Sequence, residues 1–165
     1  MARTSYAIAL GSNRPSRHGP PAATLAAALA ALAPVRVSKI RATPALGPAG
    51  RSFANAVAIV ESHLDPEEML EELKGLERAF GRRPGMRWGP RVLDLDIILW
   101  SEGPWGGPGP IVPHAEFRRR AFVLRPLVEI ASDWRDPITG ATMRQLFARL
   151  TAPRRAPRSS AGQGP

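Results

Sequence analysis

Two aspartates separated by one residue are the clearest sign of chemistry in this sequence. They lie in Leu93-Asp94-Leu95-Asp96-Ile97, where the alternation of a strand would turn both carboxylates to one face and the three apolar side chains to the other. Neighbouring carboxylates raise each other's pKa unless a cation lies between them. Because the chain has no cysteine and Mg²⁺ binds through one or two carboxylates plus substrate phosphates, Mg²⁺ is the favoured metal. The alternative is a solvated edge strand with two surface acids.

Arginines are concentrated in the segment that leads into these acids. Four of them precede Asp94 within residues 82–91, with a tryptophan, a glycine and a proline among them: Arg82, Arg83, Arg87 and Arg91. A guanidinium group offers a planar fork to phosphate oxygens, so cations beside a metal site suit a polyphosphate substrate. A solvated basic loop is the alternative, and it explains Arg91 least well because Arg91 directly enters the aspartate strand.

A second group of functional residue types follows about 20 positions later. His114, Arg119, Arg120 and Phe122 place an imidazole, guanidinium groups and an aromatic ring in one short segment. This combination favours a nucleotide pocket, in which His114 and Arg120 contact phosphates and Phe122 stacks on a planar ring. A structural histidine and a plain core position for Phe122 are the alternatives.

Length and composition limit the possible classes of protein. A chain of 165 residues fits one domain, and we expect that domain over residues 1–151, followed by a disordered basic tail rich in Pro, Arg and Gly over residues 152–165. The 23 basic and 14 acidic residues give a net charge of +9, which attracts anionic partners. Without cysteine, a disulfide framework and a cysteine nucleophile are excluded. No signal-peptide core or membrane-spanning run is evident, so we expect a cytoplasmic protein without a membrane partner.

The elements that must position these residues follow from hydrophobic periodicity and from start and stop signals. Asp65, Pro66 and Glu68 form a capping box that begins a helix ending at Gly81, with a buried stripe of Leu70, Leu73, Leu76 and Phe80. Pro126 divides an apolar segment over residues 121–131 and is expected to begin a short helix. Extended segments are expected at residues 6–10, 35–41, 53–61 and 91–100, a first helix at 22–33, and a last helix after Thr142 with Met143, Leu146, Phe147 and Leu150 inward.

The order β-α-β-β-α-β with additional C-terminal helices predicts an α+β fold of ferredoxin-like type. In this fold, helices pack on one antiparallel sheet.

Several stretches together resemble a known family. They are Tyr6-Ala7-Ile8-Ala9-Leu10-Gly11-Ser12-Asn13, Arg87-Trp88-Gly89-Pro90-Arg91-Val92-Leu93-Asp94-Leu95-Asp96-Ile97-Ile98-Leu99, Val112-Pro113-His114, and Arg120-Ala121-Phe122-Val123-Leu124-Arg125-Pro126-Leu127. In order and spacing, over about residues 5–150, they are similar to the hydroxymethyldihydropterin pyrophosphokinase family. The second stretch, which contains both aspartates, is the most specific of the four.

The resemblance implies a transferase of tetrahydrofolate biosynthesis that moves pyrophosphate from Mg-ATP to 6-hydroxymethyl-7,8-dihydropterin and leaves AMP. It implies a ferredoxin-like fold, two Mg²⁺ ions held by Asp94 and Asp96, and ATP as co-substrate. We expect a monomer with no nucleic-acid partner. The implied catalytic residues are Arg82, Arg91, Asp94 and Asp96. The implied ATP-binding residues are Lys74, Glu77, Arg82, Trp88, Arg91, Ile97, His114 and Arg120. The implied pterin-binding residues are Thr43, Pro44, Leu46, Phe53, Asn55, Trp88, Asp94 and Phe122.

The chain departs from the family pattern at a few positions. Lys74 stands where many relatives carry glutamine, and Pro84 and Gly85 stand where further basic residues are common. Gly109 lies where some members place an arginine.

Two rival functions use the same features. An RNA-binding module with a ferredoxin-like fold would fit the charge of +9, but such a module needs stacking aromatic residues on its central strands, and residues 91–100 present aspartates instead. A metal-dependent nuclease could use the carboxylate pair.

Overall fold

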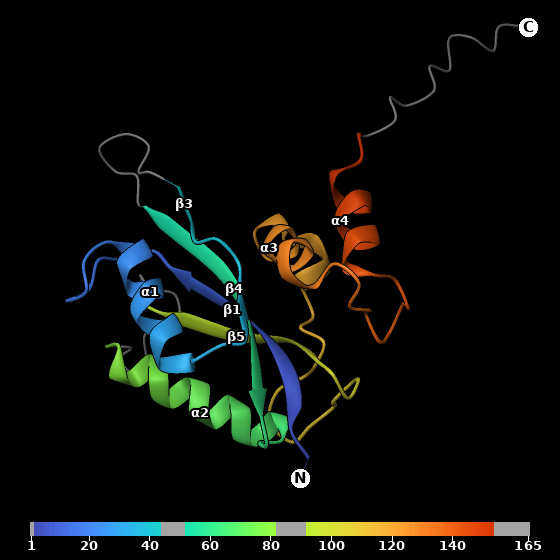
Figure 1. Ribbon diagram of the computed structural model, residues 1–165, viewed down its shortest axis with the longest axis horizontal. Helices are drawn as coiled ribbons and strands as arrows, with labels where there is room; N and C mark the ends of the chain where they lie inside the picture. The colour runs from blue at the N-terminus through green and yellow to red at the C-terminus, as the bar shows by residue number, and fades with distance from the viewer. Residues whose placement is uncertain (1, 44–51, 82–91, 154–165) are drawn as a thin grey trace, which may run out of the picture.

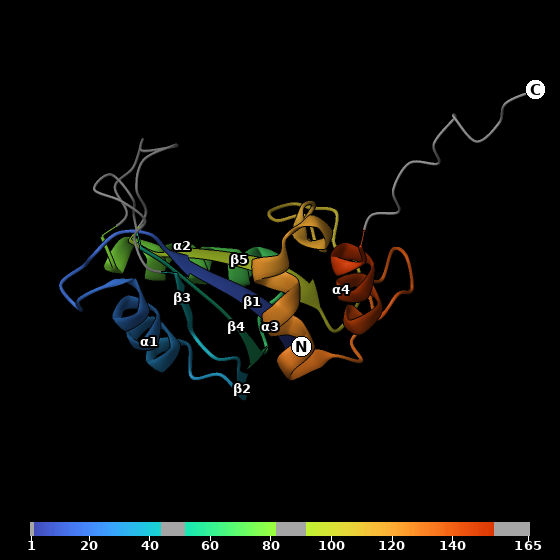
Figure 2. The ribbon, with the colours of Figure 1, turned by 90° about the horizontal axis from the view of Figure 1, so that it is seen from above.

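The protein folds into three layers, with helices on both faces of one sheet. The computed structural model describes residues 2–43, 52–81 and 92–153. Helices α1 (Pro21–Leu32) and α2 (Pro66–Ala79) cover one face of the sheet, whereas α3 (Ala121–Ala131) covers the other (Figure 1). Helix α4 (Met143–Thr151) packs against α3 on the side away from the sheet (Figure 2). The predicted α+β architecture with added C-terminal helices is confirmed.

The sheet is antiparallel and has the strand order expected for a ferredoxin-like fold. The order is β2-β4-β1-β5, and β3 also pairs with β4. Strand β1 is therefore central, between β4 and β5, and its residues reach both. The strands are β1 (Thr4–Ser12), β2 (Arg36–Val37), β3 (Arg41–Thr43), β4 (Phe53–Ser62) and β5 (Asp94–Trp100).

The single extended segment expected at residues 35–41 is two short strands. Arg36 pairs with Ile59 and Arg41 pairs with Asn55. An advance of five residues along this segment is therefore matched by an advance of only four residues along β4. The interruption falls at Ser38, whose Oγ accepts a hydrogen bond from the Val57 N–H at 3.0 Å and so replaces a ladder bond with a side-chain bond. The extra residue behaves as a β-bulge.

A second irregularity decides which side chains of β5 share a face. Ala7 pairs with Leu99 and Ile8 pairs with Ile97, which leaves Ile98 as an extra residue. Ile98 and Leu99 therefore both pack in the core beneath α3. Before the bulge the ordinary alternation holds, so Leu93, Leu95 and Ile97 point towards α1 and α2, as expected from the sequence.

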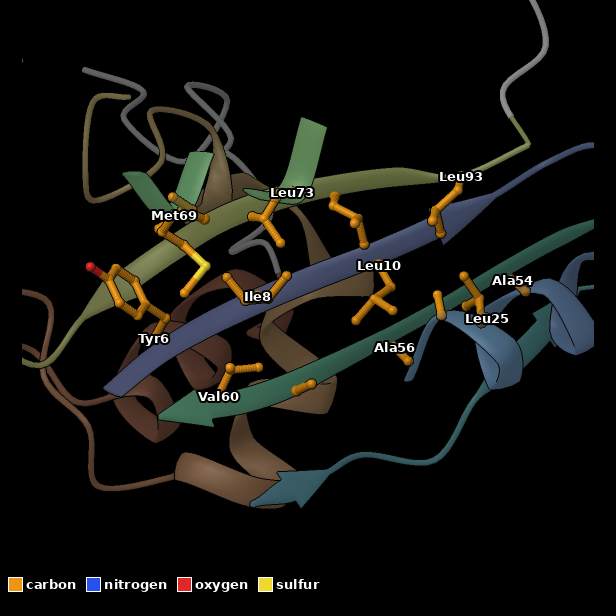
Figure 3. Packing of buried hydrophobic residues seen from close by; sticks show 14 of the residues in the cluster. Tyr6, Ile8, Leu10, Leu25, Ala54, Ala56, Val60, Met69, Leu73 and Leu93 are labelled. Carbon is orange, nitrogen blue, oxygen red and sulfur yellow. The ribbon is translucent and has the colours of Figure 1, made fainter. Parts of the chain in front are cut away.

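Two hydrophobic cores hold the layers together. The core between the sheet and helices α1 and α2 includes Tyr6, Ile8, Leu10, Leu25 and Leu73, which Figure 3 shows converging from β1, α1 and α2. The core on the other face is built by Val57, Ile59, Phe117, Leu124, Leu127 and Met143, among others. Because both faces are covered, strands β1, β4 and β5 bury residues in both cores.

The capping signals in the sequence are confirmed at both helices where they were read. In α2 the Glu68 N–H donates to Asp65 Oδ1 at 2.8 Å, and the Asp65 N–H donates to Glu68 Oε1 at 3.0 Å. In α4, Thr142 and Gln145 form the equivalent pair. These reciprocal bonds satisfy N–H groups that would otherwise lack partners, which is why the helices begin there.

Two expectations about which helix residues are buried were wrong. The fully buried stripe of α2 consists of Pro66, Met69, Leu73 and Glu77, and the remaining expected residues are only partly buried. Leu150, expected to face inward, is 37% exposed.

Pro126 lies inside α3 instead of beginning a helix. Its lack of an N–H leaves the Phe122 carbonyl without its helical hydrogen bond, while the Pro126 side chain is buried. Within the described residues, no helix is long and apolar enough to cross a membrane.

Candidate active site

A pocket of about 250 Å³ opens at one end of the sheet, beside the start of α3. The ends of β1, β4 and β5 form its floor, and the first residues of α3 form a wall. Its lining brings together several side chains that lie far apart in the sequence. They are Ala9, Leu10, Gly11, Ser12, Asn13, Phe53, Asn55, Ala56, Asp94, Asp96, Arg120, Phe122 and Val123.

The strand register explains why polar groups flank an open floor. Gly11 of the central strand β1 pairs with Asn55 on one side and with Asp94 on the other. Two strand spacings separate Asn55 from Asp94, which corresponds to about 10 Å. A Cβ atom at Gly11 would lie 3.4 Å from Asn55 Oδ1. The absence of a side chain at Gly11 therefore keeps the space between the amide and the carboxylate open.

The two aspartates share one face, as the alternation predicted. Asp94 and Asp96 are half-buried and both line the pocket. No cluster of three or more His, Cys, Asp or Glu side chains able to hold a metal occurs in the part of the chain that the structure describes. Two carboxylate donors fit Mg²⁺ nevertheless, because this ion commonly takes one or two carboxylates and completes its shell with water and substrate phosphates.

Two aromatic rings are exposed at the pocket. Phe53 is 46% exposed and Phe122 is 51% exposed, and both line the hollow. The alternative of Phe122 as a plain core residue is therefore wrong. Exposed rings at a concave site offer faces on which a planar ligand can stack. The Arg120 guanidinium, 5.8 Å from the centre of the Phe122 ring, adds a positive charge at the same wall.

His114 is held beside the aspartate strand but does not line this pocket. Its N–H donates to the Ile98 carbonyl of β5 at 3.0 Å, and its Nδ1 accepts a hydrogen bond from the Glu116 N–H at 3.1 Å. Since Nδ1 is the acceptor, a neutral imidazole here carries its proton on Nε2. The ring orientation is thus set by the turn that leads to Arg120.

Two other residues that the resemblance assigned to ATP have side chains on the opposite face of the sheet. Glu77 is 3% exposed, and its Oε2 accepts a hydrogen bond from the Leu95 N–H at 3.2 Å. Ile97 is 4% exposed within the core beneath α1 and α2. Glu77 therefore links α2 to the aspartate strand, and contact of either residue with ATP stays a prediction from the resemblance.

The other residues that the resemblance assigned to the substrates lie outside the pocket, beside it, or outside the described part of the chain. Lys74 is exposed on α2, outside the pocket lining. Thr43 is exposed at the end of β3 and pairs with Phe53, so it adjoins the pocket. Pro44, Leu46, Arg82, Trp88 and Arg91 lie outside the described residues.

Sequence reasoning assigned no role to several residues that line the pocket. Gly11, Ser12 and Asn13 were recognised only as a motif after the first strand, and Ala9 and Val123 were not singled out. One signal was available for the floor: Ala7, Ala9 and Gly11 are small residues at alternate positions of one strand. Only the pairing of β1 with both neighbours shows that this small face lies under a pocket.

Comparisons with known proteins show the family to which the chain belongs. A family model described as 7,8-dihydro-6-hydroxymethylpterin-pyrophosphokinase matches residues 7–132. A 2-amino-4-hydroxy-6-hydroxymethyldihydropteridine pyrophosphokinase from Synechocystis is 36% identical over 149 residues, covering 87% of this chain and 74% of that protein. The protein of the same name from Methylorubrum extorquens is 39% identical over 150 residues, with coverages of 87% and 91%.

A solved structure with a similar fold is that of Plasmodium falciparum HPPK-DHPS. Its TM-score is 0.68 at 12% sequence identity. The match covers 90% of this chain but only 41% of that one. At this level of identity the similarity concerns the fold alone.

Proposed function

This chain belongs to the 7,8-dihydro-6-hydroxymethylpterin-pyrophosphokinase family, and on that premise we propose that the pocket beside α3 is where its two substrates meet. The enzyme is a 2-amino-4-hydroxy-6-hydroxymethyldihydropteridine pyrophosphokinase of folate biosynthesis, with ATP as co-substrate. It transfers pyrophosphate to hydroxymethyldihydropterin and releases AMP. The observation that carries the site assignment is the meeting of two carboxylates, an arginine and two exposed aromatic rings in one pocket.

The pterin occupies the side of the pocket near β4. Phe53 and Phe122 sandwich its rings, and stacking between aromatic groups adds to the burial of apolar surface. Asn55, on the pocket floor, can both donate and accept hydrogen bonds at the edge of the heterocycle. Thr43 adjoins this position, and the resemblance adds Pro44, Leu46 and Trp88.

The triphosphate lies on the side formed by β5 and the start of α3. Asp94 and Asp96 would hold Mg²⁺, two ions by the resemblance, and this metal neutralises phosphate charge when bound. Arg120 contributes a fixed positive charge, and the resemblance adds Arg82, Arg91 and His114 as phosphate ligands. Lys74, Glu77 and Ile97 stay predictions from the resemblance, and their side chains do not line the pocket.

The reaction is a direct displacement. The hydroxymethyl oxygen of the pterin forms a bond to the β-phosphorus of ATP as the bond from that phosphorus to the AMP oxygen breaks. The residues of this chain align the two substrates and compensate the negative charge, which are the main sources of catalysis in phosphoryl transfer. No covalent intermediate with a side chain is involved.

Substitution of Asp94 tests the site. We expect Asp94→Ala to lower kcat for AMP release at least about 100-fold, because loss of a proposed Mg²⁺ ligand leaves phosphate charge uncompensated. The measurement is AMP formation with and without hydroxymethyldihydropterin, followed by ³¹P NMR. The matched control is Asp133→Ala, which removes an acid whose side chain is 90% exposed. Full activity of Asp94→Ala would refute the site, and ADP as the nucleotide product would refute the reaction.

Location and assembly remain predictions. We propose a cytoplasmic monomer, with ATP and the pterin as its partners. Gel filtration of the full chain with light scattering measures the oligomeric state directly, and a dimer mass would contradict the proposal.

A further inference from the structure

A buried acid lies in the loop between α3 and α4. The Asp136 side chain is 0% exposed. Its Oδ2 accepts hydrogen bonds from Arg118 Nε at 2.5 Å and Thr139 Oγ1 at 2.7 Å. Its Oδ1 accepts from Arg118 Nη2 at 2.8 Å and from the Ile138 N–H at 3.0 Å. Both carboxylate oxygens are thus fully engaged, and half of the bonds come from one guanidinium group.

The loop that carries Asp136 is itself held in place. The Asp136 N–H donates to the Ala141 carbonyl at 2.8 Å, and the Gly140 N–H donates to the Asp136 carbonyl at 2.8 Å. The Met143 N–H donates to the Trp134 carbonyl at 2.9 Å, which ties the loop to the start of α4. Asp136 is therefore a fixed anchor for Arg118, because its backbone and its carboxylate are both constrained.

Arg118 belongs to the turn that leads into the active site. It lies in a 3₁₀ turn, η1 (Phe117–Arg119), whose Phe117 is 0% exposed in the core beneath α3. The Arg120 N–H donates to the Phe117 carbonyl at 3.3 Å, and the Arg120 carbonyl accepts from the Val123 N–H at 3.0 Å. The turn and the first turn of α3 are thus one hydrogen-bonded unit.

We propose that Asp136 is a positioning residue: by gripping Arg118 at two points, it sets the turn that directs Arg120 and Phe122 into the pocket. The proposal rests on the proposed function, in which these two residues contact the substrates. A bidentate pair restrains both the position and the rotation of a guanidinium group, whereas a single bond restrains position alone. Asp136 lies beyond residue 132, where the family match ends. The residue proposed to position the turn therefore lies outside the matched region.

Steady-state kinetics of AMP release test the proposal with four single variants and one double variant. Asp136→Asn keeps the size of the side chain but removes the charge that Arg118 grips. Arg118→Lys keeps a positive charge but loses the fork. We expect each to lower kcat/KM about tenfold, because small misplacement of binding groups costs catalysis. Asp133→Asn, an exposed acid of the same loop, is the control and should leave kcat/KM unchanged. Assays are run at least 15 °C below each variant's melting temperature.

A double-mutant cycle separates positioning from general loss of stability. If Asp136 acts through Arg120 and Phe122, then adding Asp136→Asn to Arg120→Ala should lower kcat/KM by clearly less than about tenfold, because one of the two groups to be positioned is already absent. An undiminished tenfold loss in the Arg120→Ala background would overturn the proposal, and so would wild-type kcat/KM in both Asp136→Asn and Arg118→Lys. A different result, in which Arg120→Ala itself loses no activity, would instead remove Arg120 from the proposed substrate site.

Discussion

At the scale of single residues, the site depends on Gly11, which has no side chain, as much as on the polar and aromatic side chains around it. Gly11 lies between Asn55 and Asp94 in adjacent strands. Any side chain at this position points to the face of β1 that forms the pocket floor. The floor is open because β1 places Ala9 and Gly11 there, while Leu10 points to the opposite core.

Gly11→Val should therefore fill the pocket. We expect KM for the pterin to rise at least about tenfold with a smaller change in stability, because the added methyl groups occupy the space of the ligand. Ser5→Val is the matched control, since Ser5 lies on the same strand and face but away from the pocket lining. The measurement is the dependence of AMP release on pterin concentration, and equal KM values for both variants would contradict this account of the floor.

The Asp136 carboxylate should make the free energy of unfolding depend on pH. Burial by itself raises the pKa of Asp136, but hydrogen bonds from Arg118, Thr139 and the Ile138 N–H outweigh it and lower the pKa from 3.8 to about 2. Because the folded-state pKa lies below the unfolded value, the ionised group stabilises the fold above pH 3.8, by about 2 kcal/mol. This stabilisation is lost as the pH falls towards 2.

The comparison of wild type with Asp136→Asn isolates this effect from the other acids. We expect the difference in their free energies of unfolding to shrink by about 1 kcal/mol between pH 6 and pH 3, because the unfolded chain binds the proton first. Urea titrations at the two pH values measure it. A difference that stays constant would show that the Asp136 pKa is not lowered in the folded state.

At the scale of elements, local irregularities decide what each strand presents. The bulge at Ile98 comes after both aspartates, so Asp94 and Asp96 keep the pocket face while Ile98 and Leu99 both fill the core beneath α3. Had the bulge fallen between the aspartates, they would point to opposite faces. Helix α2 is joined to this strand by the hydrogen bond that Glu77 accepts from the Leu95 N–H.

Two glycines near α2 should respond in opposite ways to alanine. Gly75 lies inside the helix, and a Cβ atom there would meet only Arg78 Nη2, at 3.8 Å. We expect Gly75→Ala to raise the free energy of unfolding by about 0.5–1 kcal/mol, because alanine loses less backbone entropy in a helix. At Gly109, φ is +96° and a Cβ atom would lie 3.1 Å from Glu67 Cα.

Gly109→Ala is accordingly the contrasting variant. We expect it to lower the free energy of unfolding by about 1 kcal/mol or more, because the backbone conformation and the contact with α2 both oppose a side chain. Chemical denaturation of both variants provides the measurement, and a stabilised Gly109→Ala would contradict the packing.

At the scale of the whole molecule, the site lies where the sheet meets the α3 layer. Helix α3 is held at both ends: Arg118 and Asp136 restrain the turn before it, and Glu129 near its end forms an ion pair with Arg41 of β3 at 3.0 Å. The Lys39 N–H also donates to Glu129 Oε1 at 3.1 Å. The helix that carries Phe122 is therefore fixed against β3, the strand that pairs with Phe53 and Asn55 of β4.

The sequence alone determined much of the local structure and the chemistry. The aspartate face follows from alternation within one strand, and the starts of α2 and α4 follow from capping residues three positions apart. The stretches that resemble the family, with Asp94, Asp96, Arg120 and Phe122, are likewise contiguous. Each of these signals is local, because the interacting groups lie within a few residues of one another along the chain.

Only the tertiary structure decided which distant residues share the pocket. The row of Asn55, Gly11 and Asp94 depends on the pairing of three strands, and the grip of Asp136 on Arg118 joins residues 18 positions apart. The bulges at Ser38 and Ile98 and the proline within α3 are settled by packing against partners that no local pattern reveals. The physical reason is that register, burial and ion pairing are properties of surfaces in contact, whereas periodicity and capping are properties of one segment.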